Sequence, residues 1–208
     1  MKKLHILILL IILVLNNTVS AQDPVSKQTF RYFNKTEIGA GIGLGKFKTD
    51  ILSNGFQRTI KNDQLVISPQ TINGIIISDR VGLGLGLGAE FWQKGMFYPV
   101  FAHFFYDFKP ADNTPFAYIN LGEAFGKRDS TYNYSSGKGG LLFSIGFGYK
   151  MKIGKRFQFE YEIFYRYQAI QSTYRQYYIA ADSTEHFSTH DYKVPYHFAG
   201  FKIGVVFR

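Results

Sequence analysis

A strict alternation of glycine with larger apolar residues in the middle of the chain constrains the fold more than any other feature. Residues 81–92 read Val-Gly-Leu-Gly-Leu-Gly-Leu-Gly-Ala-Glu-Phe-Trp. A period of two gives a β-strand two unlike faces, because successive side chains point to opposite sides. A helix would lose about 1 kcal/mol at each glycine relative to alanine. We therefore predict a strand with one apolar face and one face lined by glycine.

The same alternation predicts seven further strands, which makes the chain all-β. They are predicted at 36–47, 66–78, 96–108, 115–126, 140–151, 157–168 and 197–208. Glu123 interrupts the apolar face of its strand, so we expect it at a rim or a bulge. The pattern does not assign the two faces of 66–78, and Pro69 there marks a strand end or a bulge.

The lengths of these strands and of their connections fit a membrane-spanning barrel. Most strands have 11–14 residues, and a tilted strand needs roughly 9–11 residues to cross a membrane. The long connections are 48–65, 127–139 and 169–194, and the short ones are 79–80, 93–95, 109–114 and 152–155. If the N-terminus lies inside, all three inward turns are short and three of the four outward connections are long. Short periplasmic turns and longer external loops are typical of outer-membrane barrels.

The N-terminus has the pattern of a secretory signal peptide. Two lysines open the chain, an apolar run follows at 4–15, and Val19-Ser20-Ala21 supplies small or short residues before a cleavage site. The run is shorter than the roughly 20 residues of a spanning helix, although an uncleaved anchor is the alternative. We expect a signal peptide at 1–21, a short periplasmic segment at 22–35 and a barrel at 36–208.

The two faces of the predicted strands indicate opposite environments. In lipid every backbone polar group must be paired, so the sheet must close, and eight strands leave a lumen that side chains fill. We expect the apolar faces to contact lipid. The residues predicted to face lipid are Leu83, Leu85, Leu87, Phe143, Ile145, Phe147, Phe201, Ile203 and Val205.

The opposite faces carry glycine and charge, which we expect inside the barrel. The predicted lumen ion-pair residues are Glu37, Glu90, Asp107, Lys150, Glu160, Glu162, Arg166 and Lys202. Buried charges are tolerated when they are paired, so we expect a plugged interior and no open pore. Five acids against three bases predict that some of these groups reach water at the barrel ends. Phe101, Phe105 and Phe164 are inward by parity and are expected over the glycine columns.

Motifs for enzymatic chemistry are weak in this chain. It contains no cysteine, which excludes disulfides and sites built on cysteine. The glycines of 84–88 resemble a dinucleotide fingerprint, but the strand continues after them where a helix is required. His103, Asp107 and Ser144 are inward by parity, yet parity alone does not bring a nucleophile and a base within reach. We predict no catalytic site, no cofactor and no metal ion.

The last predicted external loop gathers acids and histidines. They are Asp182, Glu185, His186, His190 and Asp191. His186 and His190 are four residues apart, which would suit a metal ion on a helix, but no helical pattern surrounds them. A solvated loop is the favoured interpretation.

The charge balance predicts the kind of partner. The formal net charge is +9, from 24 Lys and Arg against 15 Asp and Glu. Nine basic residues lie at or near the predicted external ends: Lys46, Lys48, Arg58, Lys61, Lys127, Arg128, Lys138, Arg175 and Lys193. We expect them to bind lipopolysaccharide phosphates, in contacts that weaken with salt. Nucleic acid is a poor partner for an exported chain.

Three segments carry a resemblance to a known family. They are the Ala21-Gln22 junction, the sequence Thr71-Ile72-Asn73-Gly74 leading into the 82–86 glycines, and the ending Gly200-Phe-Lys-Ile-Gly-Val-Val-Phe207. Over 36–208 the chain resembles the small outer-membrane protein β-barrel domain family of eight-stranded, OmpA/OmpX-like barrels. The resemblance implies assembly by the barrel assembly machinery, which commonly reads a terminal aromatic residue. Here Phe207 is penultimate and Arg208 is last.

These observations favour one function over two alternatives. We predict a monomeric, non-enzymatic outer-membrane protein with a structural, adhesion or surface-interaction role through its external loops. The first alternative is an outer-membrane hydrolase acting on lipid A, which requires a close Ser–His–acid geometry. The second is a soluble periplasmic lipocalin-like binder of a small ligand, which requires the apolar faces to point inward.

Overall fold

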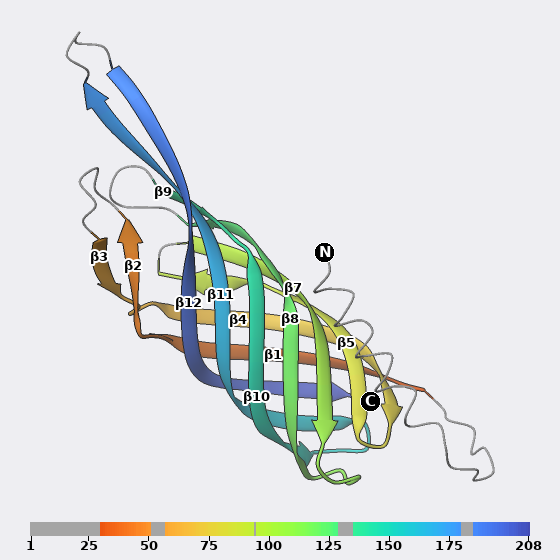
Figure 1. The fold of residues 1–208 in the computed structure, drawn as a ribbon. Helices are drawn as coiled ribbons and strands as arrows, with labels where there is room; N and C mark the ends of the chain where they lie inside the picture. Colours follow the sequence, from red (N-terminus) through yellow and green to blue (C-terminus); the bar gives the residue numbers. More distant parts are fainter. Residues whose placement is uncertain (1–29, 51–56, 94, 129–134, 180–184) are drawn as a thin grey trace, which may run out of the picture.

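A computed structural model shows a closed, all-β, antiparallel barrel (Figure 1). The structure describes residues 30–50, 57–93, 95–128, 135–179 and 185–208. Its strands are β1 (Arg31–Leu44), β2 (Lys46–Asp50), β3 (Gln57–Lys61), β4 (Leu65–Ser78), β5 (Val81–Gly88), β6 (Glu90–Trp92), β7 (Gly95–Asp107), β8 (Thr114–Arg128), β9 (Ser135–Lys138), β10 (Leu141–Lys152), β11 (Phe157–Ile179) and β12 (Glu185–Phe207). Within these ranges no helix is long and apolar enough to cross a membrane.

The barrel follows the order of the chain. Strands β1, β4, β5 with β6, β7, β8, β10, β11 and β12 each pair antiparallel with their neighbours, and β12 returns to pair with β1. Strands β5 and β6 form one barrel strand that is interrupted at Ala89. The short β9 extends the sheet between β8 and β11, whereas β2 and β3 form a separate hairpin. The predicted eight-stranded up-and-down barrel is confirmed.

Several strands extend beyond the ends that the sequence pattern predicts, and β1, β11 and β12 do so by the most residues. Strand β1 begins at Arg31, where Arg31 pairs with Ile76, so residues 31–35 belong to the barrel and not to a periplasmic segment. Both faces are polar or mixed there, and no apolar face marks the start. Strands β11 and β12 continue as a hairpin to the pair Ile179 and Glu185. The prediction of a loop at 169–194 is therefore wrong for most of its length.

The predicted signal peptide at 1–21 and the segment up to residue 29 lie outside the described residues. The predicted connection 48–65 contains the β2–β3 hairpin. In β4, burial now assigns the faces, since Ser68, Gln70 and Ile72 point inward. Pro69 lies within the strand and pairs with Ile38, so it marks neither an end nor a bulge in the pairing with β1.

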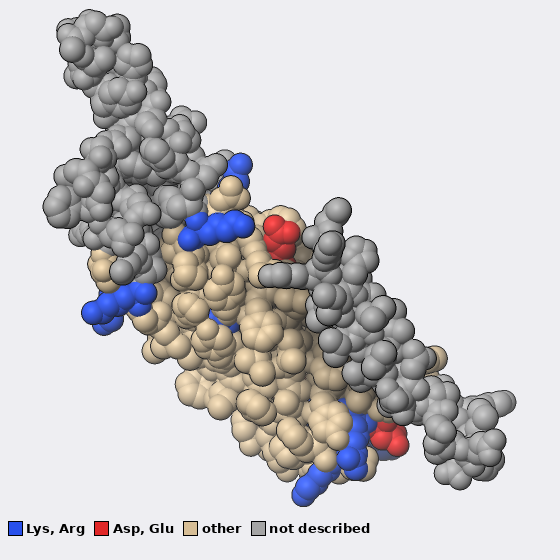
Figure 2. Space-filling model, in the orientation of Figure 1, with Lys and Arg blue, Asp and Glu red and all other residues tan. Residues whose placement is uncertain are grey.

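The outer surface of the barrel is apolar. Seven of the nine residues predicted to face lipid are exposed on it, with Leu85 and Phe201 at 71% and 70%, while Phe143 and Ile145 are half-buried. Figure 2 shows the same arrangement, with charged side chains towards the ends of the barrel and few between them. A soluble lipocalin-like binder needs the reverse arrangement, because exposed apolar area on this scale is unfavourable in water.

Glycines on the inner face accommodate large aromatic rings. A Cβ atom added to Gly82 would collide with the ring of Phe105, and one added to Gly86 would collide with the ring of Phe101. At Gly41 it would lie 3.1 Å from Phe164. The prediction that these rings lie over glycine columns is confirmed. Glycine is needed here for space and not for an unusual backbone conformation.

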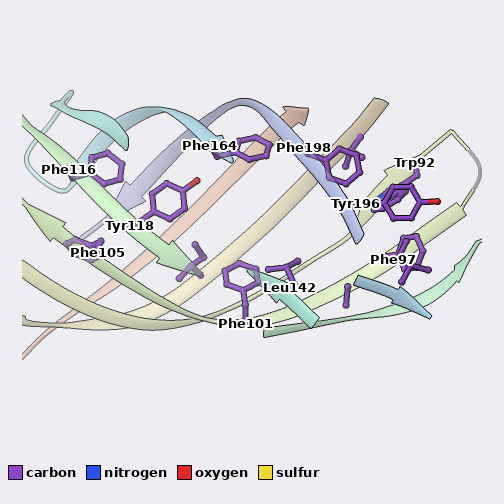
Figure 3. Packing of buried hydrophobic residues seen from close by; sticks show 14 of the residues in the cluster. Trp92, Phe97, Phe101, Phe105, Phe116, Tyr118, Leu142, Phe164, Tyr196 and Phe198 are labelled. Carbon is purple, nitrogen blue, oxygen red and sulfur yellow. The ribbon is translucent and has the colours of Figure 1, made fainter. Parts of the chain in front are cut away.

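Aromatic side chains fill the lumen towards both ends of the barrel (Figure 3). Trp92 packs against Phe97 and Phe198 at ring-centre distances of 4.9 Å, and against Tyr196 at 5.2 Å. This cluster lies near the β6–β7 connection. Phe105 and further aromatic rings lie towards the other end. Offset and edge-on aromatic contacts of this kind are favourable, so they stabilise a filled interior.

Candidate functional site: the charged lumen

One lysine lies at the centre of the buried charges. The ammonium group of Lys35 is 2.8 Å from Glu37 and 2.9 Å from Glu160, and it also donates to Glu162. The four side chains come from β1 and β11 and are at most 3% exposed. Strand alternation places Lys35 and Glu37 on the same inner face. One ammonium group thus offsets part of the negative charge of three carboxylates.

Further cations extend this cluster in two directions. Lys202 lies 2.6 Å from Glu37. Lys150 lies 2.7 Å from Asp107 and 3.6 Å from Glu160. At the end of the chain, Arg208 lies 3.5 Å from Asp107. These contacts join five strands through their inner faces.

A glutamine links the cluster to a second ion pair nearer the loops. Arg166 donates to Glu90, and Glu90 accepts a 3.3 Å hydrogen bond from the indole of Trp92. With its amide oriented to suit its neighbours, Gln70 donates to Glu37 at 3.1 Å and accepts from Arg166 at 2.9 Å. The polar contacts therefore run continuously from Arg208 to Trp92.

The structure places all eight predicted lumen residues inside the barrel and in contact with an opposite charge. Two cations that the sequence analysis did not assign also take part, Lys35 and Arg208. With them, five acids face five bases. The expectation that some of the eight predicted groups reach water at the barrel ends is wrong, because these two cations supply the missing charge.

Lys35 was missed because the predicted strand began at residue 36. The signal was parity alone, since Lys35 lies two residues before Glu37 and therefore shares its inward face. Extending the predicted strand back by one residue would have found it. Arg208 falls on the same predicted inward face as Lys202 and Gly204, but the predicted lumen ion-pair residues do not include it.

Aromatic rings surround the ammonium groups as well. Lys150 lies 3.7 Å from the centre of the Phe105 ring and 4.6 Å from that of Phe116. Lys202 lies 5.0 Å from the ring centre of Tyr118. Cation–π contacts become stronger when water is excluded, so these rings offset part of the cost of burying the lysines.

Little space remains between these groups. An interior cavity lined by Lys35, His103, Lys150 and Glu160, among others, has a volume of about 10 Å³, which is about the space of a single water molecule. Buried polar atoms of Asn120, Ser144 and Gln168 find no hydrogen-bond partner among the described residues. Such atoms are commonly satisfied by internal water. The arrangement suits a filled lumen.

The histidine and serine in the lumen do not form a catalytic pair. Nδ1 of His103 lies 2.7 Å from the side-chain oxygen of Asn120. Asn120 pairs with His103 on one side and with Ser144 on the other, so strand β8 separates the two. The hydroxyl of Ser144 has no hydrogen-bond partner among the described residues, so it is not bonded to the imidazole of His103.

No group of three or more potential metal ligands occurs among the described side chains. The loop cluster of Asp182, Glu185, His186, His190 and Asp191 lies outside the described side chains. The largest concavity that we describe, of about 590 Å³, lies on the apolar exterior. Its lining includes Ala40, Phe147, Ala199 and Phe201.

Comparison with known protein families and with curated protein sequences finds no match. Solved structures with the same architecture are found. Neisserial surface protein A (NspA) superposes with a TM-score of 0.55 at 12% sequence identity, over 86% of this chain and 98% of that one. The outer membrane protein AlkL in lipid bilayers gives a TM-score of 0.53 at 11% identity, over 90% of this chain and 93% of that one.

The chain has the fold of the small outer-membrane β-barrels. The predicted resemblance to eight-stranded barrels of this kind is confirmed at the level of the fold. At this identity the likeness carries no ligand or activity from one protein to another. The function must therefore be argued from the lumen and the two ends of the barrel.

Proposed function

We propose that this protein is a non-enzymatic outer-membrane barrel that presents its external hairpins for interaction and does not conduct ions. The observation that carries the proposal is the contrast between the two faces. The exterior is apolar along the barrel wall, while the lumen is filled by paired charges and aromatic rings. An apolar exterior suits lipid, and a filled lumen suits an anchor rather than a pore.

The location follows from the same contrast together with the N-terminal sequence. A cleaved signal peptide at 1–21 takes the chain across the inner membrane, and the barrel assembly machinery inserts it into the outer membrane as a monomer. The short turns then face the periplasm. The β11–β12 hairpin extends beyond the barrel, as Figure 1 shows at its upper left, and lies outside the cell.

The external end supplies an interaction surface. Exposed Lys46, Lys61, Lys138 and Lys193 lie near it, and the outer leaflet there is rich in lipopolysaccharide phosphates. Lysine binds phosphate as a point charge, so we expect contacts that weaken as salt increases. The β2–β3 and β11–β12 hairpins, together with 127–139, are the segments for adhesion or contact with a neighbouring protein.

Outer-membrane fractionation with a heat-modifiability assay tests this proposal. Cells expressing the protein are fractionated, and boiled and unboiled samples are compared on a mild SDS gel. We expect the protein in the outer-membrane fraction, with faster migration before boiling, because a closed barrel resists SDS. A protein in the soluble periplasm with the same migration in both samples would contradict the proposal.

A further inference from the structure

The end of the barrel that carries the short turns is strongly basic. We call it the turn end. It comprises residues 30 and 31 at the start of β1, the turns that follow β4, β7 and β10, and the C-terminal residue. Six exposed basic residues lie there against two acidic ones. The basic residues are Arg31, Arg80, Lys109, Lys152, Lys155 and Arg156, and the acidic ones are Asp79 and Asp112. Figure 2 shows blue side chains gathered at the lower end of the barrel.

Local ion pairs account for only two of these cations. Arg31 lies 3.5 Å from Asp79, and Lys152 lies 2.6 Å from Asp112. The other four, Arg80, Lys109, Lys155 and Arg156, form no ion pair within the part of the chain that the structure describes. The charge of the turn end is therefore available to a partner outside the protein.

Aromatic side chains on the outer surface lie next to three of these cations. Lys109 follows Phe108, Arg156 precedes Phe157, and both rings are about half exposed on the outer surface. Arg80 donates to the hydroxyl of Tyr106 at 3.4 Å. Aromatic residues are enriched at the boundary between acyl chains and headgroups, and neighbouring basic side chains extend from there into the headgroup region.

The cations are distributed around the barrel. Arg80 lies in the turn between β4 and β5, Lys109 in the turn between β7 and β8, and Lys155 and Arg156 in the turn between β10 and β11. In the closed strand order these three hairpins follow one another and together take in six of the eight barrel strands. A ring of this kind fits many small anionic groups around the perimeter better than it fits one acidic protein on one side.

We propose that the turn end binds the phosphate groups of anionic phospholipids in the periplasmic leaflet. The inference rests on the membrane location proposed above, and adds a lipid preference at the end opposite to the external loops. A basic residue close to an anionic leaflet strengthens binding by about fivefold. The ring would thus fix the depth of the barrel and enrich anionic lipid around it.

The test uses the protein inserted into phosphatidylcholine vesicles that contain a minority of phosphatidylglycerol. Lipids that remain bound after mild detergent extraction are counted by native mass spectrometry. The test variant carries Arg80→Gln, Lys109→Gln, Lys155→Gln and Arg156→Gln. A matched variant removes four exposed cations from the loop end, by Lys46→Gln, Lys61→Gln, Lys138→Gln and Lys193→Gln. A third variant keeps the charge, with Arg80→Lys and Arg156→Lys.

We expect bound phosphatidylglycerol to be enriched on the unmodified protein and on the charge-keeping variant. The turn-end variant should lose at least about fivefold of this enrichment, and the loop-end variant should lose less. Equal losses in the two glutamine variants, or no enrichment on the unmodified protein, would overturn the inference. The same vesicles are checked by heat-modifiability. Failure to insert would refute the proposed location itself, whereas insertion without lipid preference would refute only the lipid site.

Discussion

Lys35 shows what one residue contributes to a closed lumen. Its ammonium group contacts Glu37, Glu160 and Glu162. Glu37 also has Lys202 and Glu160 also has Lys150, but Glu162 has no other cation within ion-pair distance among the described residues. Removing one partner of a buried ion pair is costly because the remaining charge is left without compensation. Lys35 is therefore the lumen charge whose loss should matter most.

Replacing Lys35 by methionine should destabilise the barrel by about 3–5 kcal/mol. Adding Glu162→Gln should restore part of the loss, because it removes the carboxylate left without a cation. Urea unfolding of the protein in lipid vesicles measures both changes. Lys61→Met, at an exposed position, serves as the control and should change stability by less than about 0.5 kcal/mol. An equal effect of the two single substitutions would show that the lumen network does not stabilise the fold.

Side-chain parity predicts which charges face inward, but not which of them meet. Lys202 and Glu37 are 165 residues apart in sequence, and Lys35 and Glu162 are 127 apart. Their contacts depend on the register of β1 against β12 and on the reach of each side chain across the lumen. A single sequence specifies neither the register of the strands nor the reach of these side chains directly. Missing Lys35 also made the predicted charge balance wrong.

The strands show where side-chain alternation is sufficient to predict a strand from the sequence and where it is not. The glycine columns of β1 and β5 were recognisable because an inner glycine face alternates with an apolar outer face. The continuation of β11 and β12 to the Ile179–Glu185 pair was not recognisable from the sequence. Beyond the lipid neither face of a strand has to be apolar. In that region strand pairing proceeds without the alternation from which a strand is recognised.

Gly86→Val tests the fit between a glycine column and the ring above it. The added side chain would collide with Phe101, and overpacking of this kind costs about 1–3 kcal/mol. Combining it with Phe101→Ala should recover part of the lost stability in the same urea experiment. Gly154→Ala is the control, because no atom lies within 4 Å of an added Cβ there. If Gly86→Val and Gly154→Ala behave alike, the glycines do not serve to make room for the rings.

Shortening the β11–β12 hairpin should leave the barrel intact. Residues 175–189 are replaced by Asn-Gly, a pair that favours a tight hairpin turn and preserves the pairing of Tyr174 with His190. We expect unchanged heat-modifiability, since the barrel strands keep their partners. Binding of the purified protein to lipopolysaccharide should change little, because the exposed Lys46, Lys61, Lys138 and Lys193 lie outside the deleted segment. Loss of the heat-modifiable form would show that the hairpin belongs to the folding unit.

At the scale of the whole molecule, closure explains both the exterior and the interior. A sheet in lipid must have no free edge, and β1 closes it by pairing with β12 over the register from Asn34 to Leu44. Eight strands leave room for side chains only, and here the room is taken by paired charges and aromatic rings. The fold was predictable because strand length, alternation and connection length all indicate the same architecture. The function was less predictable, because the contacts proposed for the two ends follow no repeating pattern in the sequence.

Ion conductance tests the central claim most directly. The protein is inserted into a planar lipid bilayer, with insertion checked by heat-modifiability of the same preparation, and the current is recorded at several voltages. The filled, ion-paired lumen predicts no discrete current steps above those of the bare bilayer. Reproducible steps of constant size from the inserted protein would contradict it, and would show that the network from Arg208 to Trp92 opens a path for ions.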